Sequence, residues 1–217
     1  MARTLTRTQF AIAASLAALA GYVDGIGFLA LGGYFVSFMS GNTTRAGVEL
    51  VGMDLGAAGL GLLVIMSFVA GVIAGTVISS DTHDRGPMVL VAVAVFIAAA
   101  ALLSNLDVRW PMAILLAAGM GAVNTVFSGR AEASFGITYM TGALVKIGQG
   151  IVAALRGGDR TGWLRYLVLW LAIALGAIGG AAVYGGIGHW GLWGGAATAI
   201  LIAGVLRLRA RTLSART

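Results

Sequence analysis

A polar signature occurs twice in this chain, about 100 residues apart, inside sequence that is otherwise strongly apolar. The motif Gly-Tyr-Val-Asp at 21–24 is followed by Phe-Met-Ser-Gly at 38–41. The motif Gly-Ala-Val-Asn at 121–124 is followed by Tyr-Met-Thr-Gly at 139–142. The chain is therefore a duplicated unit, and each copy interrupts its apolar sequence at matching positions. This combination is typical of transporters, whose binding sites form between two repeats.

The composition predicts a protein that lies in a lipid bilayer. Hydrophobic residues make up 59% of the chain and charged residues 10%, whereas an ordinary soluble domain has roughly 25% charged residues. There is no cysteine, and the two histidines, His83 and His189, are far apart in the sequence. No Ser/His, Cys/His or metal-ligand pattern therefore exists. We expect no enzyme activity, no metal and no cofactor.

Six apolar segments are long enough to span the bilayer as helices. They are 9–33, 55–79, 87–104, 110–130, 163–184 and 190–207. Two further segments, 34–53 and 135–155, carry too many polar residues to face lipid. Because irregular backbone survives at membrane depth only where protein or water covers it, we expect these two to be broken or re-entrant helices buried against the bundle.

The predicted fold is an all-α membrane protein of about six transmembrane helices in a single domain, 1–217. Repeat 1 covers about 9–104 and repeat 2 about 110–207, each with three spans. An odd number of spans per copy makes the two repeats inverted relative to each other. The alternative is eight spans, in which the segments 34–53 and 135–155 also cross fully and the repeats are parallel.

The basic residues predict the orientation in the membrane. With the N-terminus inside, ten arginines lie at cytoplasmic ends of the spans and two at outer ends. The ten are Arg3, Arg7, Arg85, Arg156, Arg160, Arg165, Arg207, Arg209, Arg211 and Arg216, and the two are Arg45 and Arg109. Cytoplasmic loops carry such an excess, so we expect both termini to be cytoplasmic, in the bacterial inner membrane. The bilayer, not nucleic acid, then explains the net charge of +6.

Asp24 is the strongest candidate for a functional residue. A carboxylate at the centre of a membrane helix costs roughly 2.5–3.5 kcal/mol on insertion scales, so it is normally paired, hydrated or functional. The functional interpretation is a proton or cation coupling site. The structural alternative is a side chain that caps a helix break by accepting backbone N–H bonds. The second copy has Asn124, which cannot titrate, so a role shared by both copies is polar and structural.

The residues Ser40, Asn42 and Thr141 predict helix breaks that line a site or pore. Glycine permits unusual backbone angles, and the side chains of Ser, Thr and Asn can cap freed N–H groups. We therefore expect non-helical backbone at 21–27 and 40–44, with equivalent breaks near Asn124 and Thr141. The alternative is a set of buried polar turns that only stabilise the bundle.

Arg130 is the last candidate site residue. It is able to bind an anionic substrate, or to pair with Glu132 or Asp24. The alternative is an interfacial anchor whose guanidinium reaches the lipid headgroups.

The motif Gly-xxx-Gly also recurs, at 71–75 and at 176–180. This spacing lets two helix backbones approach closely in a membrane. Its recurrence at equivalent repeat positions predicts a helix-packing face. A glycine-rich face can also form a homodimer, which the sequence leaves open.

The residues at 21–43, together with the motifs Gly-Ala-Val-Asn at 121–124 and Tyr-Met-Thr-Gly-Ala-Leu-Val-Lys-Ile-Gly at 139–148, resemble the YoaK family of bacterial membrane proteins. The resemblance covers nearly the whole chain. It implies about six spans and supplies no substrate. The chain departs from the family pattern before Asn124, where Val123 stands in place of an expected Gln.

The function predicted from these observations is a small-molecule membrane transporter with a polar site between two inverted repeats, coupled to protons through Asp24. The site is lined by Asp24, Ser40, Asn42, Asn124, Arg130 and Thr141. The alternatives are an accessory or structural membrane protein without transport, and a passive channel.

Overall fold

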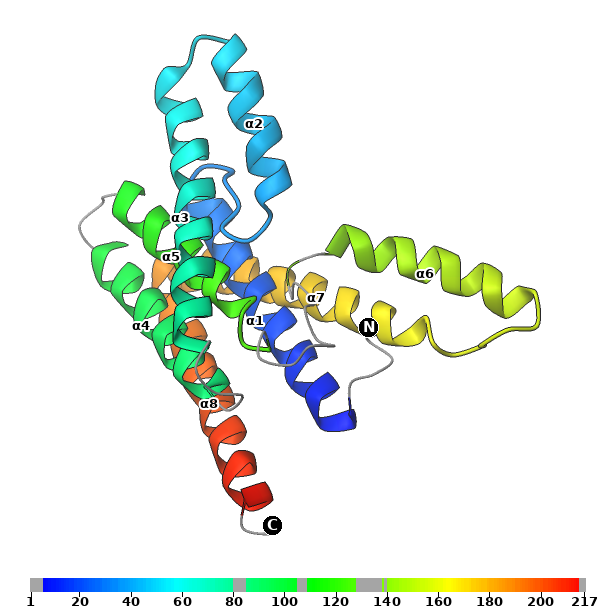
Figure 1. Ribbon diagram of the computed structural model, residues 1–217. Helices are drawn as coiled ribbons and strands as arrows, with labels where there is room; N and C mark the ends of the chain where they lie inside the picture. The colour runs from blue at the N-terminus through cyan, green and yellow to red at the C-terminus, as the bar shows by residue number, and fades with distance from the viewer. Residues whose placement is uncertain (1–5, 80–84, 105–108, 128–137, 139, 215–217) are drawn as a thin grey trace.

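The computed structural model describes residues 6–79, 85–104, 109–127, 138 and 140–214, which form eight α-helices and one short 3-10 helix (Figure 1). No strand occurs among the described residues. The elements are α1 Arg7–Ala30, α2 Met39–Val51, α3 Leu55–Ser79, α4 Gly86–Ser104, α5 Arg109–Val123, α6 Met140–Leu155, α7 Leu164–Ile187, η1 Gly188–Gly191 and α8 Leu192–Ser214.

Among the described residues, each copy of the repeated sequence contributes four α-helices. Helices α1 to α4 belong to the first copy, and α5 to α8 follow in the same order in the second. The short helices α2 and α6 fold back on α3 and α7 as hairpins (Figure 1). Both hairpin turns contain a residue with positive φ, Met53 at 61° and Gly157 at 82°. The duplication seen in the sequence is therefore also present in local structure.

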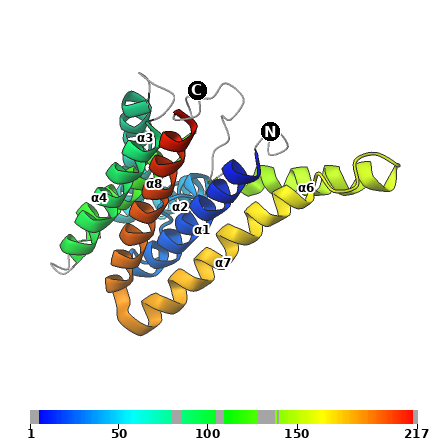
Figure 2. The same ribbon diagram turned by 90° about the horizontal axis from the view of Figure 1, so that it is seen from below.

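The two copies exchange helices, because α1 of the first copy packs along α7 of the second. Glycine permits this approach: a Cβ on Gly21 would lie 2.0 Å from the Ile173 carbonyl oxygen, and one on Gly25 would lie 2.5 Å from that of Ala177. The two contacts advance by four residues on both helices. Helices α1 and α7 therefore run parallel, as Figure 2 also shows.

The reciprocal pair, α3 and α5, packs in the same way. A Cβ on Gly71 would lie 1.9 Å from the Ala118 carbonyl oxygen, and one on Gly75 would lie 3.1 Å from the Ala122 Cα. These helices are parallel as well. The Gly-xxx-Gly motif at 71–75 thus forms a helix-packing face, as predicted, and its counterpart at 176–180 packs against α1.

Helices α4 and α8 close the bundle. Gly86 lies near Leu206 and Gly195 near Ile97, so α4 and α8 run antiparallel. Their apolar faces join one buried core with α1 and α5. The largest fully buried side chains of that core include Leu16, Ile26, Leu90, Ile97, Leu116 and Met120.

Four described stretches are long and apolar enough to cross a membrane: 7–30, 55–79, 86–104 and 164–211. The last contains both α7 and α8, which form a sharp V around η1 (Figure 2). Helix α5 has 15 residues, about 22 Å at 1.5 Å per residue and short of a bilayer core of about 30 Å. The six-span arrangement is therefore matched only in part, because the predicted span 110–130 ends as a helix at Val123.

Two of the predicted helix breaks are wrong. Helix α1 continues through 21–27, and 40–44 lies within α2. The glycines at 21 and 25 serve close packing against α7, which a regular helix provides better than a break does. The non-helical backbone lies instead at 31–38, between α1 and α2, and from Asn124, where turn structure replaces helix α5. Thr141 is the second residue of α6, so its break precedes it.

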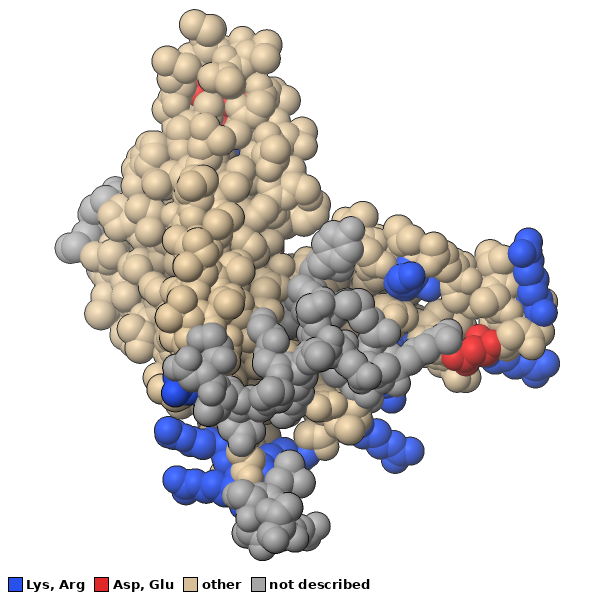
Figure 3. Space-filling view, in the orientation of Figure 1, with Lys and Arg blue, Asp and Glu red and all other residues tan. Residues whose placement is uncertain are grey.

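Basic side chains are unevenly distributed on the surface. On the face shown in Figure 3 they gather at the lower end of the molecule and at the outer end of the α6–α7 hairpin, while the α2–α3 hairpin is almost free of them. The sequence explains these two groups of basic residues. Arginines follow α6 at 156 and 160, and others lie near the end of α8 at 207, 209 and 211.

Candidate functional site

The linker 31–38, between α1 and α2, forms one wall of the candidate site. Near its start lie Gly32 and Gly33, whose φ angles of 71° and 94° are in the left-handed region that glycine adopts without strain. The Gly33 N–H donates to the Phe28 carbonyl oxygen at 2.7 Å, and the Arg45 guanidinium donates to the Gly32 carbonyl oxygen at 2.8 Å. The linker therefore turns back along α1 after the helix ends.

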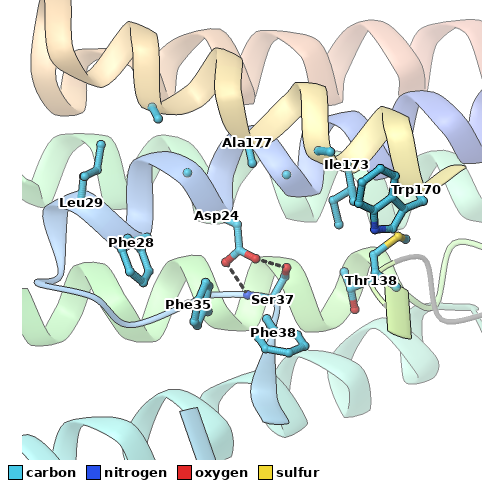
Figure 4. Close-up of a pocket in the computed structure, with 15 residues that line it drawn as sticks. Asp24, Phe28, Leu29, Phe35, Ser37, Phe38, Thr138, Trp170, Ile173 and Ala177 are labelled. Carbon is cyan, nitrogen blue, oxygen red and sulfur yellow. Dashed lines mark hydrogen bonds between the residues drawn. The ribbon is translucent and has the colours of Figure 1, made fainter. Parts of the chain in front are cut away.

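Asp24 holds this linker against α1. Its Oδ1 atom accepts hydrogen bonds from the backbone N–H groups of Val36 at 2.6 Å and Ser37 at 2.9 Å. Its Oδ2 atom accepts a third bond, from the Ser37 hydroxyl (Figure 4). The carboxylate thus satisfies backbone donors that the non-helical linker leaves without a helical partner. The structural alternative for Asp24 also predicted accepted backbone N–H bonds, but at a helix break, whereas α1 is unbroken at this residue.

The second copy repeats the contact with an amide. The Asn124 Oδ1 atom accepts from the Thr138 N–H at 3.1 Å and lies 3.3 Å from the Thr138 hydroxyl. The Asn124 amide N–H donates to the Met120 carbonyl oxygen at 2.9 Å. Thr138 occupies the place of Ser37 in the repeat, so both copies fasten the segment after the first helix with one Asp or Asn and one hydroxyl residue. We call these two contacts the latches.

Ser37 and Thr138 were missed from the sequence. Both are short hydroxyl residues in the linkers, and each lies one residue before the Phe-Met or Tyr-Met pair of the repeated motif. Their equivalent positions are the signal that identifies them, because Ser and Thr in the same register can supply the same donor.

A second anchor holds the linker from the other side. Asn42 is fully buried, and its side chain accepts from the Phe35 N–H at 3.0 Å and donates to the Phe35 carbonyl oxygen at 2.6 Å. The Tyr34 hydroxyl donates to the Glu49 carboxylate at 2.6 Å. Burial, together with that bond, raises the pKa of Tyr34 to about 12, so the phenol keeps the proton that it donates.

A cavity of about 450 Å³ lies between α1, α7 and the linker (Figure 4). Because α1 and α7 come from different copies, the cavity lies between the repeats. Asp24 is the charged residue among the described residues that line it. The lining residues are Gly21, Asp24, Gly25, Phe28, Leu29, Phe35, Ser37, Phe38, Thr138, Met140, Trp170, Ile173, Ala174, Ala177 and Ala181.

Aromatic rings cover the linker side of the cavity. The Phe28 and Phe35 ring centroids lie 4.8 Å apart in a tilted pair, and those of Phe35 and Phe38 lie 5.3 Å apart edge to face. Trp170 lies on the α7 side in Figure 4. The sequence did not single out these rings as a group, because the fold alone brings 28, 35, 38 and 170 together.

The other predicted site residues lie in different places. Ser40 and Thr141 are exposed near the N-terminal ends of α2 and α6, outside the cavity lining. Asn42 and Asn124 brace the linkers and do not line the cavity either. Arg130 lies outside the described residues. Of the five candidates that the structure describes, it thus brings Asp24 alone to this cavity, together with the latch partners Ser37 and Thr138.

A smaller cavity of about 310 Å³ lies on the other side of the linker, where Tyr34, Arg45, Arg109 and Trp110 contribute to the wall. The Arg45 guanidinium lies 3.9 Å from the Tyr34 ring centroid and pairs with Glu49 at 2.6 Å. These contacts are internal to the chain. In the described parts of the chain, no group of three or more His, Asp or Glu residues that could hold a metal ion occurs.

The exchanged apolar helices define the class of this molecule: an all-α, multi-pass membrane protein with a cavity between its two copies. Residues 12–205 match the family described as "Protein of unknown function (DUF1275)", and the chain belongs to that family. It is 39% identical over 200 residues to a UPF0700 transmembrane protein of Rhizobium meliloti (strain 1021), an alignment that covers 92% of the chain and 87% of the relative.

No solved structure matches the chain. The family is of the kind that the resemblance to YoaK predicted, a family of membrane proteins without an assigned function, although the matches do not bear the YoaK name. The location in a lipid bilayer agrees with the transmembrane relative and with the apolar helices.

Proposed function

We propose that the protein is a small-molecule transporter of the bacterial inner membrane, with its binding site between two inverted repeats. The single observation that carries this proposal is the position of the cavity. It lies along the contact of α1 with α7, one helix from each copy, and it holds a carboxylate in apolar surroundings. Sites of secondary transporters lie at such repeat interfaces.

The directions of the helices support the inversion. Helix α1 is parallel to α7, α3 is parallel to α5, and α4 is antiparallel to α8. The chain runs in opposite directions in α3 and α4 and again in α7 and α8, as Figures 1 and 2 show. If α1 runs outward, then α3 runs inward and α4 outward, while α5, α7 and α8 run inward, outward and inward. The second copy therefore follows the first with every direction reversed.

The charge distribution supports cytoplasmic termini. Arginines concentrate before α1, after α6 and along the end of α8, and this topology places all three regions on one side. An excess of Lys and Arg marks the cytoplasmic side of a membrane protein.

Asp24 is the group that can couple transport to protons. It is the one titratable side chain among the described residues that line the cavity, since α7 contributes Trp170, Ile173 and three alanines and the linker contributes Phe35, Ser37 and Phe38. A carboxylate enclosed in this way is expensive to keep in a membrane unless it serves a purpose. The latch in the second copy works with an uncharged amide, so the charge at 24 exceeds what the latch requires.

The test is uptake by the purified full-length protein in proteoliposomes. Vesicles with and without protein are incubated with a bacterial metabolite extract, with or without a pH gradient, and their contents are measured by mass spectrometry. We expect at least one solute to accumulate only with protein and only with the gradient, and Asp24→Asn to abolish the accumulation. Uptake that ignores the gradient would indicate a passive channel, and no enrichment of any solute would indicate a structural or accessory protein.

A further inference from the structure

We propose that the cavity selects small organic cations with an apolar body, such as aryl or alkyl amines and quaternary ammonium compounds. This inference rests on the proposed function for its biological meaning, but the binding site that it describes can be tested without transport. Three independent features carry it: the charge, the rings and the difference between the two copies.

The charge of Asp24 has no cation beside it among the described residues. Its three hydrogen bonds come from two backbone N–H groups and one hydroxyl, all uncharged. No Lys, Arg or His is among the described residues that line the cavity. Neutral donors orient a carboxylate and leave its net charge in place, so a bound cation would supply the compensation that a half-buried charge otherwise lacks.

The rings suit the apolar part of such a ligand. Phe28, Phe35 and Phe38 form one continuous aromatic cluster next to Asp24, and Trp170 lies across from it (Figure 4). Aromatic faces attract cations and accept apolar groups, which is how proteins recognise quaternary ammonium ligands. The small residues Ala174, Ala177 and Ala181 leave room on the α7 side, while Gly21 and Gly25 let α1 and α7 touch along the edge of the cavity.

The second copy does not repeat the charge or two of the three phenylalanine rings. It carries Asn124 where the first has Asp24, and at the sequence level it has Ser128 and Gly136 where the first has Phe28 and Phe35. The latch still forms with Asn124. The charge and two of the rings therefore belong to the first copy alone, as expected for a site that binds a ligand and not for a structural element that both copies share.

The experiment measures binding to the full-length protein in lipid nanodiscs by isothermal titration calorimetry, with empty nanodiscs as the blank. The probes are benzyltrimethylammonium, a cation, and benzylsulfonate, an anion of similar size. We expect the cation to bind on the order of tenfold or more tightly than the anion, because ionic and aromatic contacts both favour it. Equal binding of the two probes, or preference for the anion, overturns the proposal.

Variants locate the binding. Asp24→Asn copies the side chain of the second latch, and it should lower the affinity for benzyltrimethylammonium on the order of tenfold or more. Phe35→Leu should also weaken binding, and it keeps the test valid if Asp24→Asn does not fold. The control is Trp110→Leu in the smaller cavity, which should bind as the parent protein does. Parent-like affinity in a folded Asp24→Asn or Phe35→Leu protein overturns the proposal.

The two proposals fail separately. Selective binding of the cation without uptake of any solute would contradict the transporter and keep the cation site. Gradient-driven uptake of a neutral or anionic solute, without cation binding, would keep the transporter and contradict the cation site.

Discussion

Asp24 and Asn124 occupy equivalent positions, make equivalent contacts and differ in charge. Each holds the segment that follows the first helix of its copy, by accepting hydrogen bonds from a backbone N–H and a neighbouring hydroxyl residue. The common part of their role is therefore structural. What distinguishes Asp24 is a negative charge directed toward a cavity with aromatic walls.

The latch at Asp24 should contribute measurably to stability. Val36 and Ser37 are buried, so Asp24→Ala leaves two buried N–H groups without an acceptor, at a cost of about 1–3 kcal/mol for each group. Asp24→Asn retains one acceptor oxygen and should lower the free energy of unfolding by less than Asp24→Ala does. Thermal unfolding in detergent, followed by circular dichroism, measures the difference.

The control for this series is Ser40→Ala, because Ser40 is exposed and outside the cavity. Surface substitutions of this kind usually change stability by less than about 0.5 kcal/mol. If Asp24→Ala melted at the same temperature as Ser40→Ala, the latch would have no structural role.

At this scale the sequence identified Asp24 because a carboxylate inside an apolar helix is conspicuous. It did not identify the rings at 28, 35, 38 and 170, because apolar side chains in a membrane protein are expected everywhere and only the fold brings these four together. The sequence also identified Asn42, but as a residue that lines the site. In the structure its side chain forms hydrogen bonds with the backbone of Phe35 and does not line the cavity.

The helices are held together by glycines that allow two backbones to touch. A Cβ on Gly121 would lie 2.0 Å from the Phe68 carbonyl oxygen, and one on Gly176 would lie 2.1 Å from that of Ala18. In both cases the obstacle is backbone, which cannot rotate away as a side chain does. The pairs α3–α5 and α1–α7 therefore depend on the same device.

Alanine at either position should destabilise the protein. Gly121→Ala and Gly176→Ala force the paired helices apart, and we expect each to lower the free energy of unfolding by about 1–3 kcal/mol. The matched controls are Gly47→Ala and Gly148→Ala, which also lie at equivalent repeat positions in helices and have nothing within 4 Å of an added Cβ. These should be neutral or stabilising by up to about 1 kcal/mol.

The comparison is made by thermal unfolding of the four variants in the same detergent. Four equal melting temperatures would show that the exchanged helix pairs do not pack as described. A loss of stability confined to Gly176→Ala would show that the pairs α1–α7 and α3–α5 do not pack in the same way.

The bounds of the long helices were predictable from sequence, since an apolar run ends where polar or turn residues begin. The segment 55–79 matches α3. The continuous helix through 21–27 and 40–44 was not predictable in the same way, because a glycine in an apolar segment has two meanings. It permits a bend, and it also permits close contact between two regular helices, and only the position of the neighbouring helix decides between them.

At the scale of the whole molecule, the exchange of helices between the copies places the cavity. Each copy contributes one wall, α1 from the first and α7 from the second, and the linker of the first copy covers the cavity along their contact. The sequence showed that two copies exist, but it could not show that α1 leaves its own copy to pack on α7. That pairing joins residues about 150 positions apart, such as Gly21 and Ile173.

The central claim is that solutes reach the cavity between the copies from both sides of the membrane. The chain has no cysteine, so a single cysteine can be introduced by Ala177→Cys at the cavity wall. Its neighbour Ile178 is 66% exposed and does not line the cavity, so Ile178→Cys is the control expected to face lipid.

The most direct measurement is labelling of these cysteines with a membrane-impermeant maleimide, in right-side-out and in inverted vesicles. We expect the maleimide to label Ala177→Cys in both preparations and benzyltrimethylammonium to slow that labelling. Ile178→Cys should stay unlabelled. Labelling of Ala177→Cys from neither side, or from one side only under every condition, would contradict a transport site between the two copies.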